Sequence, residues 1–227
     1  MELEVWTDLV DRYGAIRRVR RMQPAGGVGD KLFPPTYPGE GSGNPPPRHV
    51  FEFRRIGSGN AQCVLIDSVQ SQANRLEEAL SQLRTQGEIY FPVVAVDFSA
   101  SSDLADIGTV DTLQAPHRVF DAIVRDAMLN GKPFGQSAEG EALVRARPDA
   151  ASAIYALSPS ALVFGAWNST GQGGGLGAKF PRAVVSEIVG IGVATETDGK
   201  PSGQQDNVLA AVSTRSVFAA ALRWSSC

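Results

Sequence analysis

The sequence has few of the residues that build metal sites, disulfides or membrane spans. Its 227 residues include two cysteines, Cys63 and Cys227, which are far apart, and two isolated histidines, His49 and His117. Such spacing supports neither a zinc site nor a disulfide framework. No hydrophobic run is long enough for a transmembrane helix, and no signal-peptide pattern is present. We therefore expect a cytoplasmic protein with no metal or other cofactor.

The chain as a whole also carries no excess positive charge, which argues against a protein that binds nucleic acid through its overall charge. The formal net charge is −3, yet arginine outnumbers lysine 17 to 4. Arginine binds phosphate in a bidentate manner better than lysine does. Four arginines stand close together with no acidic residue among them, namely Arg17, Arg18, Arg20 and Arg21. They predict a local phosphate-binding patch, although a GC-rich genome with arginine-rich codon usage would also explain the excess.

Hydrophobic spacing predicts an irregular alternation of strands and helices. The chain is long enough for one large domain or two small ones. An arginine-rich strand near the start is expected at a sheet edge, and residues 24–47, more than half glycine and proline, are expected to form a long loop. The pattern favours an α+β fold with a mixed or antiparallel sheet over a doubly wound parallel one. Expected strands span residues 15–22, 49–56, 63–66, 89–98, 161–167 and 190–194, and expected helices span residues 1–13, 67–80, 116–129, 139–147 and 149–157.

A glycine-rich segment carries the strongest local signal for anion binding. Five glycines fall within residues 171–177, after the apolar run 161–167 and before an apolar pattern that begins at Phe180, with Pro181 suited to the first turn of a helix. This order predicts a strand, a glycine loop and a helix N-terminus, whose free N–H groups attract phosphate. The residues expected to contact phosphate here are Gly173, Gly175, Gly177, Lys179 and Arg182.

Two known nucleotide motifs fit the segment poorly. A P-loop requires a lysine directly after its last glycine, but Ala178 intervenes and Phe180 takes the place of the Mg²⁺-binding hydroxyl. The dinucleotide fingerprint can be matched to Gly173, Gly175 and Ala178, although the loop before them is too long for its tight turn. A glycine linker without a ligand remains an alternative.

A polar helix face and one tryptophan complete the set of candidates. Gln70, Asn74 and Arg75 lie together on the expected helix 67–80, where they can hydrogen-bond sugar and phosphate. An ordinary exposed helix face, with Arg75 paired to Glu78, is the alternative. Trp167 is interpreted as a core aromatic rather than a base-stacking residue.

Three segments taken together resemble a known family. They are "LIDSVQSQANRLEEAL" (65–80), "HRVFDAIVRDAML" (117–129) and "SPSALVFGAWNSTGQGGGLGAKFPRAVVSEIVGIGV" (158–193). In this order they resemble the RAMP-superfamily backbone subunit of type I-U (also called I-G) CRISPR–Cas complexes, over roughly residues 60–195. The resemblance implies a single domain over residues 1–227, an RRM-like (ferredoxin-like) palm with inserted loops. It also implies a longer chain, so the C-terminus is interpreted as truncated.

The same resemblance implies a function. Such subunits bind CRISPR RNA, assemble in several copies along it with other effector subunits, and present it for pairing with target DNA without cutting either strand. No membrane partner is implied. Two alternatives stay open. One is a RAMP-type RNA-processing endonuclease with His49 or His117 as general base. The other is a dinucleotide-binding oxidoreductase that uses the glycine segment.

Overall fold

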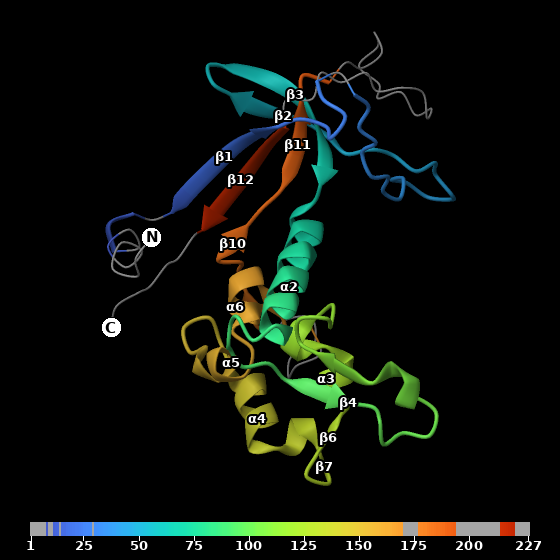
Figure 1. Ribbon diagram of the computed structural model, residues 1–227, viewed down its shortest axis with the longest axis vertical. Coiled ribbons are helices and arrows are strands. Elements are labelled where there is room, and N and C mark those ends of the chain that lie inside the picture. The colour runs from blue at the N-terminus through green and yellow to red at the C-terminus, as the bar shows by residue number, and fades with distance from the viewer. Residues whose placement is uncertain are drawn as a thin grey trace. The chain divides into compact units, whose positions relative to one another are not determined.

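The structure is a computed structural model (Figure 1) that describes residues 8, 11–13, 15–28, 30–169, 177–193 and 214–220, the last of these as backbone alone. The contacts of the chain group into two compact units. Unit 1 comprises Met1–Gln72 and Val185–Ala219, and unit 2 comprises Ala73–Val184 and Ala220–Cys227. Each unit is considered by itself below. The expectation of a single domain stays a prediction.

Unit 1 is built on an antiparallel sheet. The strands are β1 (Ile16–Met22), β2 (Phe51–Ile56), β3 (Gly59–Asp67), β11 (Ile188–Ile191) and β12 (Thr214–Ala220). Their order is β1-β12-β11-β3-β2, and the short β10 (Val184–Val185) also pairs with β12. The pairs β2–β3, β3–β11 and β11–β12 are antiparallel. The predicted α+β class with an antiparallel sheet is therefore confirmed, and β1 is an edge strand as expected (Figure 1).

The strands β2 and β3 form an antiparallel hairpin with buried residues on β3. It turns at Gly57, whose φ of 64° suits glycine. Cys63 and Val64 on β3 are both fully buried although they point to opposite faces of the sheet, so both faces are covered here. Burial raises the pKa of the Cys63 thiol. Arg54 of β2 pairs with Glu187 and with Glu52, and the hydrogen bonds that its guanidinium donates to Glu187 raise the pKa of Arg54 above its ordinary value.

Polar residues at the junction of β3 and the next helix form hydrogen bonds that stabilise the first turn of that helix. The helix α2 (Val69–Thr85) begins after Ser68, whose hydroxyl accepts a hydrogen bond from the N–H of Ser71 at 3.2 Å, as an N-cap does. Gln72 donates to the Asp67 carboxylate at 2.6 Å and accepts from the Ser186 hydroxyl at 2.8 Å. The start of α2 is thus tied to the segment before β11. The helix predicted over residues 67–80 is confirmed.

The long glycine- and proline-rich segment is a loop, as predicted. In the described part of residues 24–47 there is no helix or strand, only an isolated bridge in which Tyr37 and Arg48 exchange backbone hydrogen bonds of 2.8 and 2.9 Å. The helix predicted over residues 1–13 lies largely outside the described residues.

Unit 2 consists of short elements around one apolar cluster. Its members include Val124, Phe134, Leu143, Ile154 and Phe180, all of which are at least nine-tenths buried. Short helices and pairs of strands two or three residues long surround them. The elements are β4 (Ala95–Asp97), η1 (Ala105–Ile107), β5 (Thr109–Asp111), η2 (Arg118–Phe120), α3 (Ala122–Arg125), β6 (Met128–Leu129), β7 (Lys132–Pro133), η3 (Phe134–Gln136), α4 (Ala138–Arg145), α5 (Ser152–Leu157), α6 (Ser160–Phe164), β8 (Ala166–Trp167) and β9 (Lys179–Phe180).

Two elements predicted in unit 2 are much shorter in the structure than the sequence indicated. The helix expected over residues 116–129 is broken at Asp121, which adopts an extended backbone (φ −65°, ψ 148°) and caps α3 by accepting from the N–H of Ile123. The strand expected over residues 89–98 is reduced to β4, since Pro92 offers no N–H to a ladder. The helices predicted over residues 139–147 and 149–157 are confirmed as α4 and α5.

Candidate nucleic-acid interface

The edge strand β1 displays the predicted arginine cluster to solvent. Every residue from Arg17 to Met22 is exposed. Side chains alternate along a strand, so Arg18 and Arg20 lie on one face of β1 while Arg17 and Arg21 lie on the other. Among residues with described side chains, no carboxylate pairs with these four arginines.

Such a strand suits a polyanion because its guanidinium groups are exposed and no carboxylate with a described side chain neutralises them. Guanidinium groups on both faces of one edge can contact successive phosphates without reading bases. A charged edge also prevents pairing with the edge of another sheet, which is a second physical reason for arginine at this position. Geometry alone permits both roles.

The glycine segment has a different setting from the one predicted. Residues 161–167 form the helix α6 and then β8 instead of a strand, and the residues after Pro181 form β10 and β11 instead of a helix. Gly177 precedes β9, which pairs antiparallel with β8. The described stretch that follows the segment, residues 177–193, contains no helix, so the predicted helix-based anion site is wrong. Gly173 and Gly175 lie outside the described residues.

This correction removes one alternative function. A dinucleotide-binding fold requires a strand, a glycine turn and a helix whose N-terminus holds the pyrophosphate. Here the strand β9 stands in the place of that helix. The oxidoreductase alternative is therefore abandoned.

Lys179 is paired with an aromatic ring. It lies directly opposite Trp167 in the β8–β9 ladder, and its ammonium nitrogen is 4.8 Å from the centre of the indole ring. Trp167 is 45% exposed, so the expectation of a core aromatic is wrong. Both side chains are exposed to solvent.

The other predicted contact residues occupy mixed environments. Gln70, Asn74 and Arg75 are all exposed on α2, where they are accessible to a ligand. Arg182 is partly buried, and its buried Nε has no hydrogen-bond partner among the described residues. The binding roles of these four residues stay predictions.

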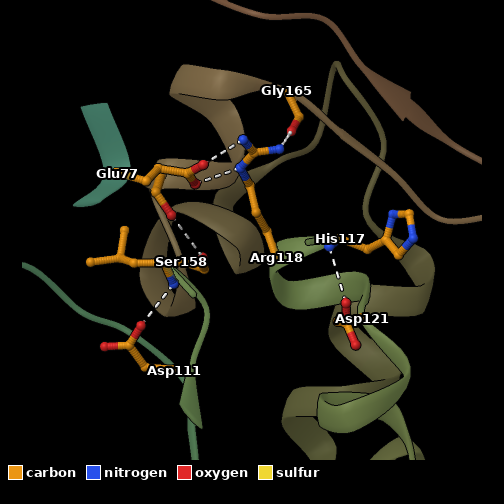
Figure 2. Close-up of polar contacts among 9 residues, drawn as sticks. Glu77, Asp111, His117, Arg118, Asp121, Ser158 and Gly165 are labelled. Atoms are coloured by element: carbon orange, nitrogen blue, oxygen red, sulfur yellow. Dashed lines mark hydrogen bonds and ion pairs between the residues drawn. The ribbon is translucent and has the colours of Figure 1, made fainter. Parts of the chain in front are cut away.

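A buried ion pair, which the sequence did not reveal, supports this part of unit 2 (Figure 2). Arg118 donates from Nε and Nη2 to the two carboxylate oxygens of Glu77, at 2.6 and 2.7 Å, and from Nη1 to the carbonyl of Gly165 at 2.9 Å. Glu77 and Arg118 are 3% and 9% exposed. Burial raises the pKa of Glu77, and the charge and hydrogen bonds of Arg118 oppose that shift. The guanidinium also lies 5.7 Å from the centre of the Phe164 ring.

The one sequence signal for this pair was the position of its acid. Glu77 lies four residues after Ala73 on the apolar side of α2, and Ala73 is itself buried. A carboxylate on a buried stripe requires a partner. Its arginine is 41 positions away, so spacing could not identify it.

The two histidines belong to different units, His49 to unit 1 and His117 to unit 2. Nδ1 of His49 is 3.0 Å from the carbonyl oxygen of Pro35, so this nitrogen carries the proton and donates it. His117 is exposed, and its backbone N–H donates to Asp121 at 3.0 Å.

Within the described ranges, no three His, Cys, Asp or Glu side chains are grouped so that they could hold a metal ion. No helix there is long and apolar enough to cross a membrane.

The fold and these side chains define an α+β protein with an antiparallel sheet and an arginine-rich edge suited to a polyanion. The comparison with protein families identifies it further. The model of the family described as CRISPR-associated protein GSU0053 matches residues 16–195, well over half of the chain. The chain belongs to this family of CRISPR-associated proteins, which confirms the resemblance to a CRISPR–Cas subunit and supports a role in CRISPR defence. No curated protein matches the chain.

Proposed function

We propose that this protein is a non-catalytic backbone subunit of a type I-U/I-G CRISPR–Cas complex, which binds CRISPR RNA and assembles along it in several copies. Other effector subunits and target DNA complete the complex. The observation that carries the proposal is the edge strand β1, with four exposed arginines in a CRISPR-associated chain.

The exposed arginines of β1 suit the contacts that such a subunit has to make with RNA. A guide RNA has a variable sequence, so the subunits that hold it must contact sugar and phosphate and leave the bases free to pair. Arginines at an exposed edge supply charge and bidentate donors with no requirement for a given base. β1 meets this demand with two arginines on each face.

Further contacts are proposed outside β1. Polar side chains on α2, the side chains of Lys179 and Arg182, and backbone N–H groups of the glycine segment are proposed as additional donors to the RNA backbone. The proposed residues are Gln70, Asn74, Arg75, Gly173, Gly175, Gly177, Lys179 and Arg182.

The non-catalytic part of the proposal has a direct test. End-labelled single-stranded RNA that contains a CRISPR repeat is incubated with the protein in the presence of Mg²⁺. We expect the RNA to be bound at low salt and to stay at full length, because His49 is held by its own chain and His117 lacks a second group aligned for proton transfer among the described residues.

A double variant, His49→Ala with His117→Ala, is the matched control and is expected to behave identically. Discrete shorter products that disappear in this variant would show that the protein is an RNA-processing endonuclease instead.

A further inference from the structure

Trp167 and Lys179 form an exposed pair whose placement is determined by the strands beneath it. They are opposite each other in the ladder of β8 and β9, and the neighbouring pair is Ala166 with Phe180. Phe180 is 5% exposed and its ring stacks on that of Phe120, with centres 5.9 Å apart and planes 15° apart. Since side chains alternate along a strand, the inward Phe180 turns Lys179 outward.

The backbone on either side of Trp167 is also fixed. The residue after it, Asn168, is 7% exposed, and its N–H donates to the carbonyl of Ala178 at 3.0 Å. Two residues before it, the carbonyl of Gly165 accepts from the buried Arg118, which Glu77 holds (Figure 2). Gly165 itself has a φ of 82°, and a Cβ there would lie 2.7 Å from Cγ of Arg182. Trp167 is thus an exposed aromatic ring on a rigid base.

We propose that Trp167 is a stacking site for one nucleobase of single-stranded RNA and that Lys179 binds the phosphate beside that base. This inference rests on the proposed function. An indole ring with 45% of the residue exposed presents a large apolar surface to water, which stacking of a base would cover. Stacking on aromatic side chains tolerates every base, because each has a π face.

The lysine gives the site its selectivity for an anionic ligand. An ammonium group against an indole face is a weak attraction at an exposed position, so Lys179 can leave the ring for a phosphate at little cost. A purely apolar partner would gain nothing from this charge and would have to desolvate it. The pair therefore fits a nucleotide, which offers a flat ring and a negative charge together.

The test uses the fluorescence of Trp167 itself. The chain has three tryptophans, so Trp6→Phe with Trp224→Phe leaves Trp167 as the only one. This variant is titrated with unlabelled single-stranded RNA, and affinity is measured separately by anisotropy of labelled RNA. We expect the emission of Trp167 to be strongly quenched at saturation, because a stacked base quenches indole. We also expect Trp167→Leu to weaken binding about tenfold and Trp167→Phe to retain most of the affinity.

The matched control is Tyr155→Leu, which removes another exposed aromatic of unit 2, 69% exposed, and is expected to leave affinity unchanged. Circular dichroism confirms that each variant is folded. If anisotropy shows RNA binding while Trp167 emission and the affinity of Trp167→Leu are unchanged, the stacking site is wrong and the proposed function stands. If the unaltered protein binds no RNA, both are wrong. Quenching or a blue shift that requires a protein partner instead of RNA would assign the ring to a protein contact and overturn the proposal.

Discussion

Replacing Arg17, Arg18, Arg20 and Arg21 together with alanine is expected to weaken binding of single-stranded RNA by about a hundredfold or more at low salt. All four side chains are exposed on β1, and each charge-assisted contact to phosphate contributes on the order of 1 kcal/mol or more. The loss should be equal for unrelated RNA sequences, because phosphate contacts carry no sequence information. Anisotropy titrations with two unrelated RNAs measure it.

Salt dependence gives the same experiment a second readout. Each lost phosphate contact lowers the slope of log affinity against log salt by about 0.7 for a single strand, so four lost contacts lower it by about 3. The matched control removes four exposed arginines elsewhere and the same net charge: Arg84, Arg125, Arg145 and Arg147. The control should change slope and affinity far less. Equal effects in the two variants would mean that β1 is not the binding strand, and no effect in either would leave codon usage as the explanation of the arginines.

Replacing Arg118 with alanine is expected to destabilise the protein by about 3–5 kcal/mol, because it leaves the carboxylate of Glu77 buried without its partner. The same change removes the hydrogen bond from Arg118 to the carbonyl of Gly165, the residue directly before β8. The free energy of unfolding is measured by urea denaturation followed by circular dichroism.

The backbone of Arg118 provides an internal comparison. Its φ is 54°, a conformation that costs a residue with a Cβ about 1–2 kcal/mol and costs glycine little. Arg118→Gly should therefore be less destabilising than Arg118→Ala, although the same ion pair is lost. Arg145→Ala, which breaks the exposed pair with Glu141, should change stability by less than about 1 kcal/mol. An Arg118→Ala variant as stable as Arg145→Ala would show that the buried pair does not hold unit 2 together.

Those elements whose patterns are local could be predicted from the sequence. α2 has an apolar stripe and a serine cap, and the hairpin of β2 and β3 has alternating residues around a glycine turn. β1 was predicted as an edge strand, and its density of arginine agrees with that position, because a buried central strand would not tolerate so many charges. In each case neighbouring residues contain the information that decides the structure.

Segments that depend on distant partners could not be predicted in the same way. Val184, Val185, Ile188 and Val189 follow a helical spacing, yet they are β-branched and suit strands equally well. What decides between helix and strand is pairing: Ile188–Ile191 aligns with β3, more than 100 positions earlier in the chain. Hydrophobic spacing within one window carries no information about that partner.

The candidate site shows the same division. The exposure of the β1 arginines and of Gln70, Asn74 and Arg75 was predictable, because polar residues on an edge strand or a helix face have little reason to be buried. Trp167 was misjudged because the run before it was interpreted as a buried strand. The break at Gly165 ends α6 and begins a new strand, and that strand turns the indole outward.

The measurement that tests the central claim most directly is the stoichiometry of the protein on RNA. The protein is purified together with its partner subunits and a guide RNA, and the intact particle is weighed by native mass spectrometry for guides of two lengths. The account predicts RNA in the particle and more copies of this chain on the longer guide. A particle that lacks RNA, or one that holds a single copy of the chain at both lengths, would contradict it.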